Sequence, residues 1–78
     1  MKKVIDLHGL THEESLVKVE EYLLLNSFDN DLDLELITGK SPKLQQKIIN
    51  QILNKHNFNY YIPNHNTGVM FITDTRIN

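Results

Sequence analysis

The 78-residue chain contains no cysteine, only three glycines and two prolines, and no long apolar run. Without cysteine it has no disulfide framework, no thiolate zinc site and no cysteine nucleophile. The basic residues at the start of the chain are followed by only two apolar residues before Asp6, too few for a signal peptide or a membrane span. We therefore expect a cytoplasmic protein with no membrane partner.

Neither sign of charge is in large excess, because the formal net charge is -2 and the pI about 6.0. A general electrostatic attraction to nucleic acid is therefore absent, and a polyanionic partner would have to be held by a local basic patch. The length fits a single domain over residues 1–78, which buries roughly 60% of its unfolded surface. A chain of this size has no room for separate catalytic and binding domains.

Apolar periodicity predicts four strands and two helices in the order βαβαββ. The clearest strand covers residues 32–37, where leucines alternate with acids, so one face is buried and the other wet. Thr11 with Glu14 predicts a capping box at one helix start, and Ser41 before a proline predicts the other. The predicted strands are 3–7, 32–37, 58–62 and 69–73, the helices are 12–26 and 42 to 56 or 57, and a polar turn covers 27–31.

Crossovers of the usual right hand that progress in one direction place both helices on the same face of the sheet. We therefore predict a two-layer α/β sandwich with a mixed four-stranded sheet. Successive side chains of a strand point to opposite faces, so Ile5 and Leu7 are expected in the core. Val4, Asp6 and His8 then share the uncovered face with the acids of the second strand.

Asp6, His8 and Gly9 stand where the first strand ends, which is the usual location of sites in open α/β sheets. A carboxylate beside an imidazole can fix the tautomer of the ring, which suits general acid/base catalysis, and the same pair can bind a divalent metal. The alternative is a solvated Asp and His at a strand end, with Gly9 chosen for the turn.

The segment Thr-Gly-Lys-Ser at 38–41 links the second strand to a helix start, where free N–H groups and the helix dipole favour an anion. The segment does not match a Walker A loop, because Leu34 stands where that motif requires its first glycine, and we do not expect a nucleotide-hydrolysing P-loop. The alternative is a tight turn with a capping serine and exposed lysines. The residues predicted to bind phosphate or nucleic acid are Gly9, Thr38, Gly39, Lys40, Ser41, Lys43 and Lys47.

The two motifs should lie side by side, because the first two strands are expected to be parallel neighbours. A phosphate held by Lys40 would then be within reach of the Asp6 and His8 pair, as phosphodiester cleavage requires. Asp33 and Glu35 could join Asp6 in an oxygen-rich metal site. The alternation of acids with leucines in residues 32–37 more often indicates a solvated strand face. Tyr61 could stack a base, although aromatic residues in strands more often cover the sheet. The remaining histidines, His12, His56 and His65, are expected at the surface.

Three segments together resemble the small MutS-related (Smr) domain. Residues 5–11 are similar to that family's Leu-Asp-Leu-His-Gly signature, residues 36–41 to its second motif and residues 68–72 to its terminal strand. The resemblance implies a fold like the C-terminal domain of a translation initiation factor, in which the fourth strand inserts antiparallel between the second and third. The family's second motif usually carries a further glycine where Ser41 stands, and this departure affects the loop expected to approach phosphate.

The resemblance also implies nuclease activity: nicking of DNA in repair or recombination, or cleavage of RNA, in some members at stalled ribosomes. Asp6 and His8 match the residues that the family uses for cleavage. We therefore predict a stand-alone endonuclease with little sequence specificity, whose partner is DNA or RNA, free or on the ribosome. The sequence requires no cofactor. A divalent metal ion is the only cofactor that its residues suggest. The competing hypotheses are a non-catalytic nucleic-acid or ribosome-binding module, and an interaction domain that uses a broadly apolar sheet face.

Overall fold

The elements of the chain follow the predicted order in a computed structural model that describes residues 3–26 and 32–73. The strands are β1 (Lys3–Asp6), β2 (Asp33–Ile37), β3 (Asn59–Tyr61) and β4 (Val69–Thr73), and the first helix is α1 (His12–Asn26). The second helix runs without a break through α2 (Pro42–Ile48), the π-helical segment η1 (Ile49–Leu53) and α3 (Asn54–His56). The predicted elements are confirmed to within about a residue at each end, whereas the turn predicted over 27–31 lies outside the described residues.

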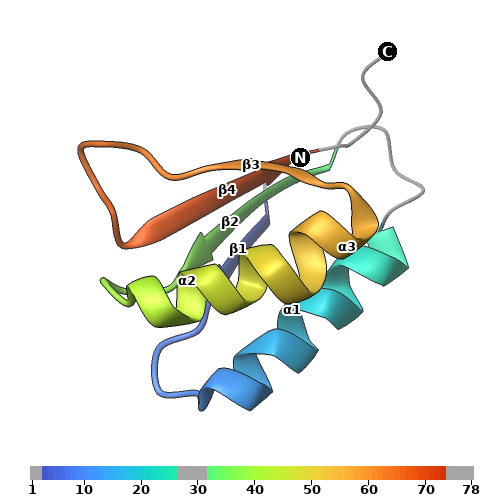
Figure 1. The fold of residues 1–78 in the computed structure, drawn as a ribbon, viewed down its shortest axis with the longest axis horizontal. Helices are drawn as coiled ribbons and strands as arrows, with labels where there is room; N and C mark the ends of the chain where they lie inside the picture. The colour runs from blue at the N-terminus through green and yellow to red at the C-terminus, as the bar shows by residue number, and fades with distance from the viewer. Residues whose placement is uncertain (1–2, 27–31, 74–78) are drawn as a thin grey trace.

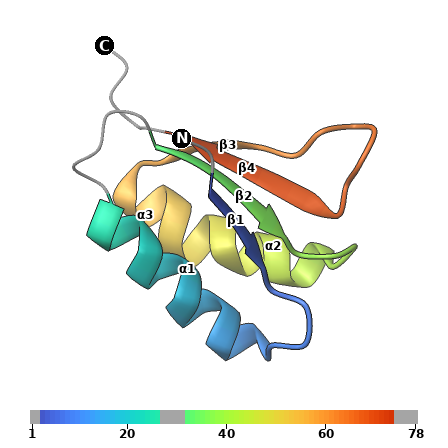
Figure 2. The same cartoon turned by 180° about the vertical axis from the view of Figure 1, so that it is seen from behind.

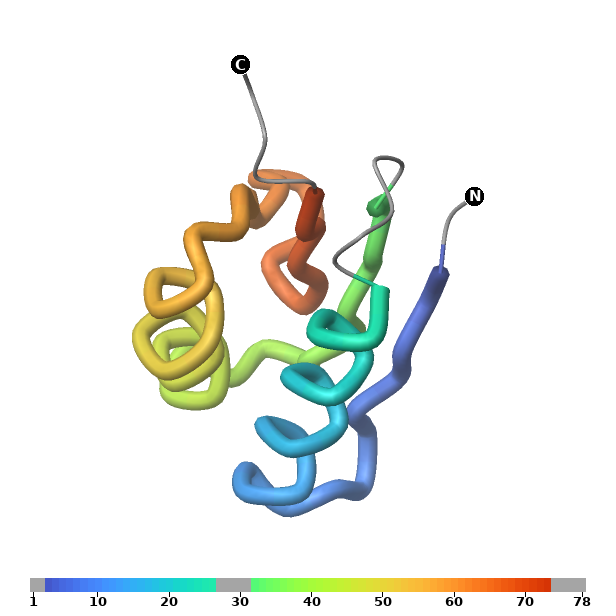
Figure 3. The backbone as a smooth tube through the Cα atoms, turned by 90° about the vertical axis from the view of Figure 1, so that its right-hand side faces the viewer, coloured from blue at the N-terminus to red at the C-terminus, as the bar shows by residue number. Residues whose placement is uncertain are grey.

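The four strands form one mixed sheet in the order β1-β2-β4-β3. β1 and β2 are parallel, and β4 runs antiparallel to both β2 and β3. α1 and the second helix cover the same face of this sheet (Figures 1 and 2), and β1 forms an outer edge beside β2 (Figure 3). The fold is therefore the predicted two-layer α/β sandwich, including the inserted fourth strand that the resemblance implied.

α1 begins at the predicted capping box. The N–H of Thr11 donates to Oε1 of Glu14 at 2.9 Å, and the N–H of Glu14 donates to Oγ1 of Thr11 at 3.0 Å. These bonds satisfy two donors that a helix start would otherwise leave unpaired. The helix buries Val19 and Leu23 and also Ser15, a polar residue that the apolar pattern did not predict to be buried.

The second helix has defined signals at both ends. Oγ of Ser41 accepts from the N–H of Leu44 at 3.3 Å, which makes Ser41 the predicted N-cap. At the other end Asn57 adopts a left-handed φ of 65°, and the N–H of Phe58 donates to the oxygen of Leu53 at 2.9 Å. This is the Schellman closure of a helix end. The π-helical turn of η1 in the middle is a feature that helical spacing did not predict.

The two faces of the sheet differ in the way that strand alternation predicted. The helix-facing side chains are buried and include Ile5, Leu34, Leu36, Met70 and Ile72. The opposite face carries the acids of β2 and, at the end of β1, the exposed side chain of Asp6. The predicted placement of the acidic positions on the uncovered side is therefore confirmed. No helix in the two described ranges is both long enough and apolar enough to cross a membrane.

Candidate functional site

Three connecting segments meet at the edge of the sheet where β1 and β2 end. The N–H of Leu7 donates to the oxygen of Ile37 at 3.0 Å, which extends the β1–β2 pairing one step beyond the last ladder pair. The backbone N–H groups of Thr38 and Gly39 both donate to the oxygen of Gly68, each at 2.9 Å. The predicted adjacency of the two motifs is therefore confirmed, and the segment before β4 joins them.

Asp6 holds the turn that carries His8. Its Oδ1 accepts the backbone N–H of His8 at 2.9 Å, which is the local bond that Asp often makes in turns. The N–H of Leu10 then donates to the oxygen of Leu7 at 3.2 Å, and Gly9 takes a φ of 83° that a side chain would disfavour. Asp6 thus bonds to the backbone of His8 rather than to its ring, and the His8 side chain is exposed.

The polar groups of the second motif are used within the protein. The hydroxyl of Thr38 donates to the oxygens of Gly39 at 2.8 Å and Gly68 at 3.2 Å, and the N–H of Ser41 donates to the oxygen of Gly39 at 2.8 Å. The amide of Gly39 is already engaged with Gly68. Thr38, Gly39 and Ser41 therefore build a frame that links the loop after β2 to the segment before β4.

Gln45 is the residue of this edge that sequence reasoning missed. It is buried on α2, and its Nε2 donates to Oγ1 of Thr38 at 2.9 Å and to the oxygen of Thr67 at 2.8 Å. It therefore ties the loop after β2 to the segment before β4. The available signal was a glutamine next to Leu44 and three residues before Ile48, on the apolar stripe of the helix.

Gly68 completes the contact between these loops. A Cβ atom at this position would lie 3.4 Å from the backbone carbon of Gly39 and 3.4 Å from Oδ1 of Asn66. Such distances are at the close limit of ordinary van der Waals contact, so Gly68 packs directly against the loop after β2.

The predicted lysines lie around this frame. Lys40 and Lys43 are exposed, whereas Lys47 is half-buried and its Nζ lies 3.3 Å from Nδ1 of His12. His12 is half-buried in this contact, so it is partly exposed at the surface and also packs against Lys47. It joins the start of α1 to α2, near the turn that follows β1. Residues 38–56 carry four lysines and no acid, which makes this unit the basic part of a chain with a net charge of -2.

The other predicted groups lie apart from this edge or fail to converge. Asp6, Asp33 and Glu35 share one face of the sheet, but no three metal-ligating side chains gather into a site among residues 3–26 and 32–73. His56 lies on α3 and bonds through Nε2 to Oε2 of Glu20 on α1 at 3.1 Å. His65 is exposed in the segment between β3 and β4.

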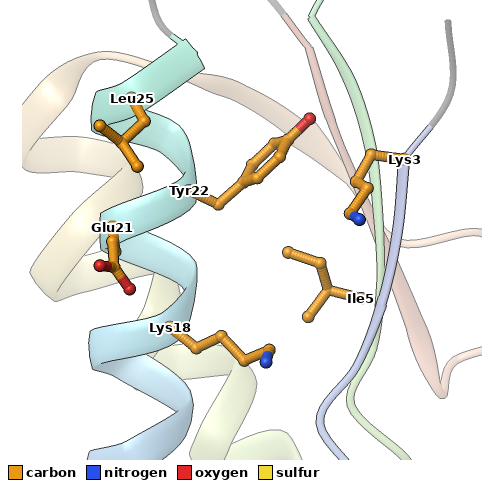
Figure 4. A pocket seen from close by; sticks show the side chains of 6 residues that line it. All are labelled: Lys3, Ile5, Lys18, Glu21, Tyr22 and Leu25. Carbon is orange, nitrogen blue, oxygen red and sulfur yellow. The ribbon is translucent and has the colours of Figure 1, made fainter.

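A pocket of about 250 Å³ opens between α1 and the free edge of β1. Figure 4 shows the ammonium groups of Lys3 and Lys18 directed into it and the Tyr22 ring extending from α1 toward the strand near Lys3. Lys3 is at the start of β1, whereas Asp6 is at its end on the opposite face. This pocket is therefore separate from the edge where the three connecting segments meet.

No model of a known protein family and no curated protein matches this chain. The resemblance to the Smr domain accordingly rests on its three motifs. Two of these motifs end at the same edge of the sheet, and the third starts there, because Gly68 bonds to the loop after β2.

Proposed function

We propose that this protein is an Smr-type endonuclease. It holds a nucleic acid backbone with the lysines after β2 and cleaves it with His8 as the catalytic residue. The observation that carries the proposal is the bond from Leu7 to Ile37, because it sets the turn of Asp6 and His8 beside the loop that bears Lys40. Phosphodiester cleavage can use an exposed imidazole for proton transfer and lysine side chains to offset the charge of the phosphate. Residues 38–56 add no acid that would repel the phosphate.

His8 is the general base in this scheme. Its ring takes the proton of the attacking hydroxyl, either water or a ribose 2′-OH, as that oxygen bonds to phosphorus. The bond from phosphorus to the leaving oxygen then breaks, and the leaving oxygen takes a proton from the imidazolium or from water. The ammonium group of Lys40 offsets the negative charge that gathers on the phosphoryl oxygens. Asp6 is a positioning residue, because it holds the backbone of His8.

Cleavage of single-stranded RNA and of supercoiled DNA by the purified protein, with and without a chelator, tests the proposal directly. His8→Ala should lower the rate by roughly 10²- to 10⁴-fold, the usual contribution of a general base. His65→Ala is the matched control, because this histidine is also exposed in a loop but has no assigned role. Equal rates for the His8 variant and the unsubstituted protein would refute the catalytic assignment.

Two substitutions of Asp6 separate positioning from charge. Asp6→Asn keeps an oxygen that can accept the N–H of His8, so it should retain most of the activity if Asp6 only holds the turn. Asp6→Ala removes that oxygen and should lower the rate while leaving the KM for nucleic acid nearly unchanged. Equal losses in both variants would instead assign the carboxylate charge itself to catalysis.

A non-catalytic nucleic-acid or ribosome-binding module is the second candidate. The internal use of the Gly39 and Ser41 amides favours it, because backbone donors that could stabilise a reacting phosphate are already engaged. Binding of nucleic acid without cleavage by any preparation would support this function over the first. The uncovered sheet face carries the carboxylates of Asp6, Asp33 and Glu35, so it is not the broadly apolar surface that the interaction-domain hypothesis requires. In either candidate function the protein would act in the cytoplasm.

A further inference from the structure

An aromatic pair lies on the uncovered face of the sheet. Tyr61 of β3 and Phe71 of β4 are register partners, and their rings stack with centroids 5.1 Å apart and an angle of 23° between the planes. Tyr61 is 58% exposed although it sits within a strand. Phe71 therefore supports one side of a flat ring that remains largely in water.

This pair shares its face with the candidate site. The ladder partners align Val4, Glu35, Phe71 and Tyr61 in one row across the four strands. Asp6 lies on the same face two residues further along β1. Neighbouring strands are about 4.8 Å apart, so three strand spacings place the row's two ends roughly 15 Å from each other. A few nucleotides of an extended strand can cover that distance.

We propose that Tyr61, supported by Phe71, is a stacking platform for an unpaired base, so that the protein takes single-stranded nucleic acid across the open face of its sheet. This inference rests on the proposed function and names its substrate class. A flat aromatic ring can stack on any base whose face is free, whereas in a duplex the neighbouring base pairs stack on both faces of each base.

The charges around the sheet restrict where the phosphates of a bound strand can lie. Asp33 and Glu35 place carboxylates on β2, one of the two inner strands, which disfavours phosphates over this part of the sheet. Lys40 and Lys43 lie beyond the strand end. The backbone of a bound strand would therefore follow the lysine-bearing edge and turn its bases toward the sheet.

A cross-strand aromatic pair can also stabilise a sheet without binding anything. That reading predicts that removal of the Tyr61 ring lowers stability but leaves affinity for nucleic acid unchanged. The test must therefore measure binding and unfolding on the same variants.

Tyr61→Leu and Tyr60→Leu form a matched pair, because Tyr60 is the adjacent residue on β3 and pairs with the buried Ile72 on the other face. Binding is measured by fluorescence anisotropy with short single-stranded RNA, single-stranded DNA and duplex DNA. Tyr61→Leu should weaken single-strand affinity roughly tenfold or more and leave duplex affinity unchanged, since base stacking on a side chain is worth that much. Tyr60→Leu and Tyr61→Phe should bind within about twofold of the unsubstituted protein.

An abasic nucleotide scanned along the single strand sharpens the test, because one position should lose affinity for the unsubstituted protein but not for Tyr61→Leu. If Tyr61→Leu keeps its single-strand affinity while Lys43→Glu loses it, the stacking inference is overturned and the proposed function stands. Equal loss on single strand and duplex also overturns it. If the unsubstituted protein binds no nucleic acid at all, both proposals fail.

Discussion

The connection from β1 to α1 and the connection from β2 to α2 follow parallel neighbouring strands, yet they use their polar groups differently. In the first, Asp6 fixes the backbone of His8 and leaves the imidazole exposed. In the second, the hydroxyl of Thr38 and the amide of Gly39 are tied to Gly68. The first connection therefore presents a side chain that can react, and the second is a rigid frame with lysines around it.

The helices that follow these connections also differ in charge. α1 carries four glutamates and one lysine, whereas residues 38–56 carry four lysines and no acid. The small net charge of the chain therefore conceals a division between an acidic helix and a basic one that lie side by side (Figure 1). Nucleic acid should approach the second unit, where attraction to phosphate is not cancelled locally.

The same charge reversal on each helix is the strongest test of this division. Lys43→Glu on α2 should lower affinity for nucleic acid roughly tenfold near physiological salt, and it should reduce the salt dependence of binding by about one phosphate contact. Lys18→Glu on α1 is the matched control and should change affinity by about twofold at most. Titrations at several salt concentrations measure both effects. A larger loss with Lys18→Glu would place the nucleic acid on α1 and break the comparison.

Local signals explain why the sequence predicted so much of the fold. The capping box of Thr11 and Glu14 and the cap at Ser41 are hydrogen bonds between residues close in the sequence. Both helix starts could therefore be predicted from the sequence. Alternation in β2 likewise identified the buried leucines. The hydrogen bond from the N–H of Gly39 to Gly68 could not be predicted from the sequence. The two residues are distant in the chain and meet only once β4 has inserted beside β2.

The role of Gln45 was missed for the same reason, since both of its partners are brought to it by tertiary structure. Tyr61 was considered from its residue type alone, and its stacking on Phe71 depends on a register that no local pattern states. The sequence thus indicated which residues have suitable chemistry at the site. The structure shows which of their polar groups are already hydrogen-bonded within the protein.

Gln45 provides a test of the rigid frame after β2. Gln45→Leu removes a buried amide that makes two hydrogen bonds, and it leaves the oxygen of Thr67 without that donor. The free energy of unfolding should fall by about 1–2 kcal/mol in urea titrations. Gln46→Leu is the matched control, because Gln46 is the exposed neighbour and should cost less than about 0.5 kcal/mol. Equal costs at the two positions would mean that the frame does not depend on the Gln45 bridge.

Ser15 is the counterpart of Gln45 on the acidic helix and gives the smallest expected effect. It is fully buried on α1, and its hydroxyl has no hydrogen-bond partner among the described residues. Ser15→Ala should therefore raise the free energy of unfolding by about 0.5–1 kcal/mol, since it removes an unpaired polar group and favours the helix. Ser41→Ala should lower it by a similar amount, about 0.5–1 kcal/mol, because that hydroxyl caps α2. Opposite signs for the same substitution would show that the buried hydroxyl of Ser15 destabilises α1, whereas the hydroxyl of Ser41 stabilises the start of α2. A loss of stability in Ser15→Ala would contradict that contrast.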